Sequence, residues 1–288
     1  VLRVLDDDGR HLVVQVPLID PPIYVAVWKV QVGRVPLYLL DTHIDENLPE
    51  NRSISHRLYL KELECRLRQE IVLGIGGRKV LHALGVDYSA MHLNEGHSAF
   101  GILERLRERL VAGMPRGEAF ERVRGTSVFT THTPVAAAHD VFPEDLMAKY
   151  FRSYCPSLDL DWDEFMALGG DPHNPGAGFN MTAFALRMSL FHNGVSQRHG
   201  EVAREMWQPL WPDLPVEDVP IDAITNGVHM PSWLNHRIEA LFDRYMDVVY
   251  PNWREDYDNP IIWEVVDEIP DDELWGEHQW LKMKLFAR

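Results

Sequence analysis

Three short polar segments hold the side chains best suited to chemistry, and each follows a short apolar run. The segments are residues 92–97, 130–134 and 224–229. The first is the densest, because it places two imidazoles, a carboxylate and an amide within six residues. A hydrophobic core has no use for polar groups at this density, since a buried polar group needs a hydrogen-bond partner. We therefore predict that the three segments contribute to one site.

The elements that position these segments follow from hydrophobic periodicity. Apolar runs predict strands at residues 23–32, 35–40, 91–93 and 128–131. Apolar residues at helical spacing predict helices at residues 60–71, 99–110 and 181–191. We expect the glycines at 74, 76 and 77 to end the first helix, Gly113 to end the second and Asn180 to open the third.

Strands that take turns with helices over this length predict an α/β fold with a parallel sheet and right-handed crossovers. Ligands of such sheets bind beyond the carboxyl ends of the strands. The three polar segments come directly after predicted strands or apolar runs. They therefore lie where this rule places a site.

The two ends of the chain differ from its middle. Residues 1–16 alternate like an edge hairpin around a turn at 6–10, and the chain opens at Val1 without Met, which indicates an entry in mid-domain. After about residue 215, acidic residues mix with tryptophans and strand signals become rare. We expect one domain at residues 1–215, followed at 216–288 by an acidic, Trp-rich helical connection and the start of a second domain.

Composition narrows the class of protein. Among the 288 residues, no apolar run is long enough to cross a bilayer and no signal peptide opens the chain, so no membrane partner is expected. Two cysteines are too few for a disulfide framework and favour a reducing compartment, with the cytoplasm as the expected location. The net charge of −16 argues against a nucleic-acid partner, because nucleic-acid affinity depends on Lys and Arg neutralising phosphates.

At this point the motifs carry a resemblance. The sequence is similar to the α-glucan (glycogen/maltodextrin) phosphorylases, nearly from end to end and in consistent order, and it is closest to their short bacterial and archaeal type. The segments that carry the resemblance are residues 32–41, 68–77, 92–100, 129–135, 139–140, 179–182, 192–196, 225–229 and 233–234.

The resemblance implies a fold, a reaction and a cofactor. Family members consist of two Rossmann-like domains facing across a cleft, the GT-B arrangement. They cleave a terminal α-1,4-linked glucose with inorganic phosphate, releasing glucose 1-phosphate with retained configuration. Their pyridoxal phosphate is carried on a lysine of the second domain, and its phosphate relays the proton. The implied partners are an α-1,4-glucan or maltooligosaccharide and inorganic phosphate, with a homo-oligomer as a further expectation.

This chain resembles an internal fragment, the later part of the first domain and the entry to the second. None of its six lysines stands in the family's Gly-Asn-Met-Lys setting. We therefore expect no pyridoxal phosphate on this chain and no phosphorolysis by it in isolation. Its cleft face, normally covered by the second domain, is expected to promote self-association.

Residue roles are implied by the resemblance, position by position. His132 matches the histidine beside the glucose at the cleavage point, whose main-chain carbonyl stabilises positive charge at the anomeric carbon, a catalytic role. Asn226 matches the asparagine that reaches the glucose hydroxymethyl group. Glu95 and His97 match residues that line the channel for the rest of the glucan. Asn193 lies in a turn close to the same cleft, and we add it to the substrate-binding residues. No metal ligand is expected.

Each assignment has a structural alternative. Glu95 precedes a helix and is also suited to the positive end of the helix dipole, His97 to binding loop carbonyls, and Asn226 with Gly227 to an ordinary turn. Two groups are expected to be structural. They are the histidines at 92, 139, 192, 199 and 229, and a set of helix-face charges or inter-helix pairs, Arg68, Glu70, Arg187 and Arg204.

Other classes of protein remain as alternatives. A zinc hydrolase could draw ligands from histidines 92, 97, 132 and 139 and from Glu95, but the spacing is not His-Glu-x-x-His. A non-catalytic glucan-binding module or remnant would keep the fold without catalysis. Glycogen synthase shares the architecture but lacks these His-Thr-Pro and Asn-Gly-Val-His runs. One departure from the short type is also present: residues 59–63 replace its Gly-Gly-Asp turn.

Overall fold

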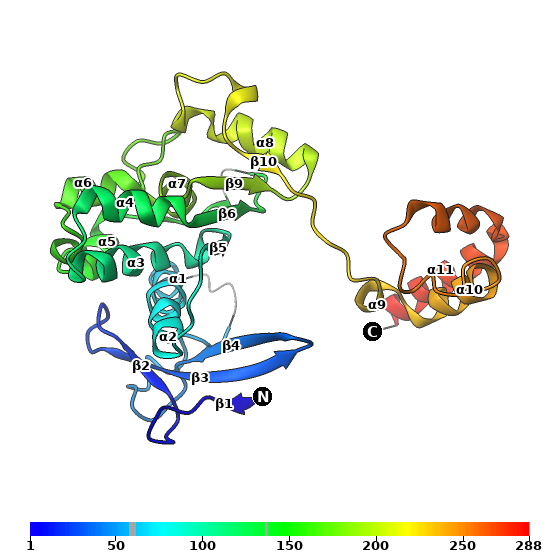
Figure 1. Ribbon diagram of the computed structural model, residues 1–288, viewed down its shortest axis with the longest axis horizontal. Helices are drawn as coiled ribbons and strands as arrows, with labels where there is room; N and C mark the ends of the chain where they lie inside the picture. Colours follow the sequence, from blue (N-terminus) through cyan, green and yellow to red (C-terminus); the bar gives the residue numbers. More distant parts are fainter. Residues whose placement is uncertain (58–61, 136–137, 288) are drawn as a thin grey trace. The chain divides into compact units, whose positions relative to one another are not determined.

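The chain forms two compact units in a computed structural model that describes residues 1–57, 62–135 and 138–287. The first unit is Val1–Thr225 and the second is Asn226–Arg288 (Figure 1). The departure noted at residues 59–63 lies largely outside the described residues, which resume at Glu62. No helix in the described ranges is long and apolar enough to cross a membrane.

The first unit begins with an antiparallel sheet whose longest strand pairs with the three others. Its strands are β1 (Leu2–Arg3), β2 (Val13–Val16), β3 (Ile23–Val32) and β4 (Val35–Asp41). β1, β2 and β4 all run antiparallel to β3. The predicted strands 23–32 and 35–40 therefore exist, but they belong to this sheet and not to the parallel sheet that carries the polar segments (Figure 1).

The parallel sheet forms the centre of the first unit. Its strands are β5 (Met91–Asn94), β6 (Ser127–Thr131), β9 (Phe191–Gly194) and β10 (Asp222–Ala223), in the order β10-β9-β6-β5. All three strand pairs in it are parallel. The strands β7 (Val141–Phe142) and β8 (Phe179–Asn180) form a separate antiparallel ladder. An α/β fold with a parallel sheet is thus confirmed.

Helices and aromatic side chains build the core around this sheet. The α-helices of the first unit are α1 (Leu63–Ile71), α2 (Gly77–Ala83), α3 (Phe100–Val111), α4 (Arg116–Gly125), α5 (Glu144–Phe151), α6 (Trp162–Leu168), α7 (Met181–Arg187) and α8 (Gln197–Trp207). Short 3-10 turns cover Gly96–Ser98, Cys155–Leu158, Gln208–Leu210 and Val216–Asp218. Phe100 packs against Phe151, Phe179 and Phe184, so α3 lies at the centre of the apolar core.

The predicted stop of the first helix at its glycines is wrong. The chain continues from α1 through a π-helical turn, Val72–Gly76, directly into α2. Gly74 lies so close to α3 that an added Cβ would be 2.7 Å from the Gly101 nitrogen, and a Cβ on Gly76 would be 3.1 Å from Val16. These glycines therefore permit close packing of the helix and do not end it.

Two other helix boundaries test the sequence predictions. Gly113 has φ +86° directly after α3, which confirms it as a helix terminator. The Asn180 side chain accepts hydrogen bonds from the amides of Thr182 and Ala183, so the predicted N-cap of α7 is also confirmed. The helix ends at Arg187, however, and Phe191 belongs to β9 rather than to the helix face, because the chain there pairs with β6.

The second unit is helical in the residues described. It contains α9 (Met230–Trp233), α10 (His236–Met246), a 3-10 helix (Pro260–Glu268) and α11 (Asp271–Phe286). Its own apolar core consists of Ile238, Leu241, Phe242, Met246, Trp253, Ile262 and Ile269. The structure divides after Thr225, later than the expected boundary at 215, because β10 still pairs with β9 of the first unit.

Candidate functional site

Two of the three polar segments meet at the carboxyl ends of the parallel strands. In the strand register Asn94 of β5 lies opposite Thr130 of β6, which lies opposite Asn193 of β9. Glu95 and His132 directly follow the ends of β5 and β6. The third segment runs across the division between the units, and its Asn226 is exposed at the start of the second unit.

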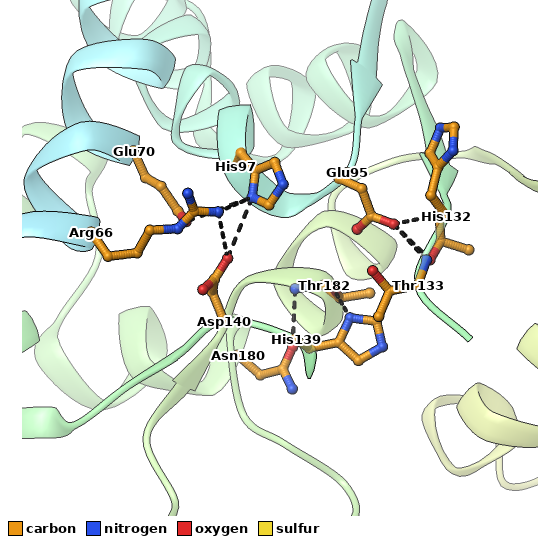
Figure 2. A network of polar contacts seen from close by, with 11 residues as sticks. Arg66, Glu70, Glu95, His97, His132, Thr133, His139, Asp140, Asn180 and Thr182 are labelled. Atoms are coloured by element: carbon orange, nitrogen blue, oxygen red, sulfur yellow. Dashed lines mark hydrogen bonds and ion pairs between the residues drawn. The ribbon is translucent and has the colours of Figure 1, made fainter. Parts of the chain in front are cut away.

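Glu95 holds the turn that contains His132. One carboxylate oxygen, Oε1, accepts hydrogen bonds from the backbone amides of His132 and Thr133, the latter at 2.8 Å (Figure 2). The side chain is 9% exposed and the residue has φ +66°, a left-handed conformation that is uncommon for glutamate. Its side chain makes no capping hydrogen bond to the short 3-10 helix that follows.

The Glu95 contacts fix the direction of the His132 carbonyl. The Thr133 N–H and the His132 C=O belong to one planar, trans peptide, so they point in opposite directions. Because Glu95 accepts from that N–H, the carbonyl points away from Glu95. The His132 ring also points away from the carboxylate (Figure 2). The turn therefore presents a carbonyl whose orientation is set by a buried carboxylate.

His97 belongs to a second, neighbouring network. Its Nδ1 lies 3.3 Å from Oδ2 of Asp140, 3.8 Å from Oε1 of Glu70 and 2.5 Å from Nη2 of Arg66. Arg66 also lies 2.9 Å from Glu70 through Nε and 3.0 Å from Asp140 through Nη2. Arg66 and Glu70 are one turn apart on α1, while Asp140 immediately precedes β7 (Figure 2). We call these four residues the His97 network.

Burial and charge shift three pKa values in the His97 network. Hydrogen bonding to Asp140 and then to Glu70 raises the pKa of His97 to about 9. Burial raises the pKa of Glu70 to about 7. Burial would also raise the pKa of Asp140, but hydrogen bonds from His97 and Arg66 outweigh burial and hold that pKa well below its usual range.

Arg66 and Asp140 favour opposite protonation states of the same ring nitrogen. Arg66 can donate only to an unprotonated Nδ1, whereas Asp140 accepts only from a protonated one. The two carboxylates stabilise a protonated ring and one guanidinium disfavours it. The protonated form of His97 is therefore favoured.

A metal ion does not fit the His97 network well. Glu70, His97 and Asp140 offer ligand atoms that all lie within 4.8 Å of one another. Among the described residues, these three form the one group whose spacing could suit a metal ion. The guanidinium of Arg66 already lies against all three side chains. Of the residues proposed for zinc, only His97 belongs to this group, so the zinc alternative gains no support.

A chain of hydrogen bonds crosses the three strands beside Glu95. Nε2 of His92 lies 2.7 Å from the Thr130 hydroxyl, which donates at 2.8 Å to Oδ1 of Asn193. Because that hydroxyl has one proton, it accepts from His92, whose Nε2 is therefore protonated. Asn193 also donates to the carbonyl of Gly194 at 3.1 Å. Asn193 is thus buried and already bonded to protein groups.

The residues expected to be structural do not all have a structural role. His139 is buried, with Nδ1 2.8 Å from the Thr182 hydroxyl, and burial lowers its pKa. His192 lies against backbone carbonyls, including that of Pro220. Of the two interpretations of Glu70, the helix-face charge is wrong, because its side chain is 1% exposed, whereas a pair between helices is present, because Glu70 of α1 lies 3.8 Å from His97 of the following 3-10 helix. The signal was present in its spacing, one turn from Arg66 and three residues from the buried Leu67.

A pocket opens beside the His97 network. Its volume is about 280 Å³, and its polar lining consists of Arg66, Glu70 and His97 together with Ser55, Arg57 and Gln69. The remaining lining includes Leu40, Ile54, Val72 and Leu73, which are apolar. A pocket with apolar walls and a few convergent polar groups has the character of a ligand site.

The fold and the site thus define an α/β protein with polar residues gathered at the carboxyl ends of its parallel strands. No family model matches the chain. It is 43% identical over 272 residues to a maltodextrin phosphorylase from Thermococcus litoralis, covering 94% of this chain and 32% of that protein. It is 39% identical to a glycogen phosphorylase from Aquifex aeolicus, covering 96% and 39%.

A glycogen phosphorylase from Mycobacterium tuberculosis is 35% identical over 99% of this chain and 33% of its own length. The resemblance to the α-glucan phosphorylases is therefore confirmed along nearly the whole chain. The chain spans about a third to two fifths of the length of these relatives.

Proposed function

We propose that this chain contributes the glucan side of the cleft in an α-1,4-glucan phosphorylase. The proposed reaction converts a glucan and inorganic phosphate into a shortened glucan and glucose 1-phosphate, and the proposed architecture is the Rossmann-like first domain of a GT-B fold. The observation that carries the proposal is the similarity of 35–43% to glycogen and maltodextrin phosphorylases over almost the entire chain. The parallel sheet with polar residues at its carboxyl ends is compatible with it.

In this reaction His132 acts through its backbone carbonyl. A carbonyl dipole aimed at the anomeric carbon stabilises the positive charge that develops in an oxocarbenium-like transition state. Glu95 is then a positioning residue, because it accepts from the amide of the same peptide and so fixes the carbonyl direction. This role differs from direct lining of the glucan channel, since the buried carboxylate is already engaged by backbone amides.

Of the remaining candidates, His97 and Asn226 are assigned to the sugar and Asn193 to the protein itself. His97 is half-buried and borders the 280 Å³ pocket, so its ring is accessible to a hydroxyl group. Asn193 is bonded within the sheet and is better suited to holding the strand ends in register. Asn226 is exposed, and we assign it to the glucose at the cleavage point on the basis of the resemblance.

The cofactor of the proposed reaction, pyridoxal phosphate, does not fit the residues of this chain. None of the six lysines stands in the Gly-Asn-Met-Lys setting. Two of them, Lys79 and Lys149, are paired with Glu104 and Glu64. The chain's own contribution is therefore to bind and orient the sugar.

The proposal is tested by a chimera. The segment of the Thermococcus litoralis enzyme that aligns with this chain is replaced by this chain, and release of glucose 1-phosphate from maltoheptaose is measured. We expect phosphorolysis by the chimera, and none by this chain alone. A folded chimera that binds maltoheptaose but releases no glucose 1-phosphate would support the alternative, a non-catalytic glucan-binding module.

Calorimetric titration of the isolated chain with maltoheptaose gives an independent readout. Saturable binding is expected, with cellohexaose as the control for linkage. Absence of maltoheptaose binding, together with an inactive chimera, would contradict both functions.

A further inference from the structure

A cluster of arginines lies at the opposite ends of the same parallel strands. Tyr88 precedes β5, and Ser127 is the first residue of β6, so these residues mark the amino ends of the strands. A pocket of about 260 Å³ opens there between α2 and α3. Arg78, Arg105 and Arg109 contribute three guanidinium groups to its lining. We call this cavity the arginine pocket.

Tyr88 lies at the centre of the arginine pocket. The guanidinium carbon of Arg78 lies 5.3 Å from the centroid of the Tyr88 ring, and that of Arg105 lies 5.7 Å from it. Both distances are within the range of cation–π contacts. Two guanidinium groups are thus held against one aromatic ring of the pocket lining.

The charges of the arginine pocket are incompletely matched. Glu108 accepts from Nε and Nη2 of Arg78, but Nη1 of Arg78 is buried without a hydrogen-bond partner in the described residues. Arg105 is 3% exposed and bonds to neutral groups, the hydroxyl of Ser127 and the hydroxyl and carbonyl of Thr126. A buried guanidinium without a carboxylate partner is costly.

Arg109 adds to this imbalance. Within the ranges that the structure describes, its side chain makes no hydrogen bond or ion pair. Burial lowers the pKa of Arg105, and the charges of Arg109 and Arg78 lower it further. Three cations therefore repel one another around a pocket whose lining holds two carboxylates. Glu108 is already engaged by Arg78, and Asp87 is exposed and makes no ion pair with the three arginines in the described residues.

We propose that the arginine pocket binds a small phosphate-bearing anion. Guanidinium groups match phosphate oxygens in geometry and charge, and a dianion would supply the missing counter-charge for Arg105 and Arg109. The volume of 260 Å³ is below the range of about 300–1,000 Å³ typical of larger ligands, which favours inorganic phosphate or a compact phosphate ester. This site is separate from Glu95 and His132 and does not depend on the proposed reaction.

The test is calorimetric titration of the full chain with inorganic phosphate and, separately, with glycerol 3-phosphate. We expect saturable binding in 150 mM chloride, about the physiological ionic strength, and Arg109→Gln should weaken it roughly 10- to 100-fold, the equivalent of one charge-assisted hydrogen bond. Arg109→Lys should retain part of the affinity, since it keeps the charge but not the planar fork. Tighter binding of the ester would identify an ester as the natural ligand.

Thermal unfolding provides the control for folding. Arg109→Gln removes a repulsive charge, so without ligand it should unfold at the same or a higher temperature than the parent chain. Arg198→Ala is the matched control, because Arg198 is an exposed arginine paired with Glu201, and it should bind phosphate normally. Undetectable binding of both anions, or equal affinity in Arg109→Gln and the parent chain, would overturn the proposal.

Discussion

The two ends of the parallel strands differ in how far the charges of their side chains are paired. At the carboxyl ends, Arg66 lies among Glu70, His97 and Asp140, so cations and anions are matched within the protein. At the amino ends, Arg105 and Arg109 lack carboxylate partners in the described residues. A matched network is fixed in shape before any ligand arrives, whereas an unmatched one gains stability when an anion binds.

One helix links the two ends. α3 begins at Phe100, shortly after His97, and its second half carries Arg105 and Arg109. Substitutions in the His97 network, in the arginine pocket or at the contact with α3 should therefore show how much each end of the strands contributes to stability.

Removing Arg66 should have the largest effect. Arg66→Ala removes the guanidinium from Glu70 and Asp140 and leaves His97 as their remaining cation, and breaking such a buried pair costs about 3–5 kcal/mol of unfolding free energy. Urea denaturation measures this loss. Arg198→Ala, which breaks an exposed pair with Glu201, should change stability by less than about 1 kcal/mol. Similar losses in the two variants would contradict a matched, buried network.

A methyl group at Gly74 should disturb α3 and hence both ends. The added Cβ would lie 2.7 Å from the Gly101 nitrogen and 2.8 Å from Cβ of Phe100, so the helices must separate. We expect Gly74→Ala to destabilise the chain by about 1–3 kcal/mol. Gly117→Ala in α4 meets no atom within 4 Å and should be neutral or stabilising by up to about 1 kcal/mol. A neutral Gly74→Ala would contradict the close approach of this turn to α3.

Replacing Glu95 separates its charge from its hydrogen bonds. Glu95→Ala leaves the amides of His132 and Thr133 without their acceptor, which should cost about 1–3 kcal/mol. Glu95→Gln retains a carbonyl oxygen at the same place and should lose less. In the active chimera, the Ala variant should lower kcat more than it raises KM, while Gln restores most of the rate. Equal defects in the two variants would assign the role to the charge instead.

The meeting of two polar segments at the strand ends could be predicted from the sequence because its signals are local. Glu95, His97 and His132 stand in dense motifs next to strands whose periodicity is plain, and Asn180 has the residue type of an N-cap. The parallel order of the strands followed from their alternation with helices.

The partners of His97 could not be predicted in the same way. Arg66 and Asp140 are 74 residues apart, and nothing in the sequence states that they meet. The glycines at 74 and 76 were misinterpreted for a related reason. A glycine that permits close helix packing cannot be distinguished in the sequence from one that ends a helix, because the difference depends on tertiary contacts.

The pH dependence of stability should distinguish the two ends. The pKa of His97 is raised from 6.5 to about 9, so its contribution is fully present below about pH 6.5 and is lost as the pH rises towards 9. Glu70, with a pKa raised to about 7, loses its contribution in the same direction between about pH 4.5 and 7. Asp140, with a lowered pKa, contributes above its ordinary value of 3.8 and acts in the opposite sense only in acid.

We therefore expect the unfolding free energy to fall by about 1–2 kcal/mol between pH 6.5 and 9 because of His97, after allowance for its partial exposure to solvent. Urea denaturation across this range should show a flatter profile for His97→Asn. Arg109→Gln should keep the profile of the parent chain, because guanidinium groups do not titrate in this window. If His97→Asn and the parent chain have parallel profiles, the ring nitrogen accepts from Arg66 and carries no proton, and the charge match at the carboxyl ends is made by Arg66 alone.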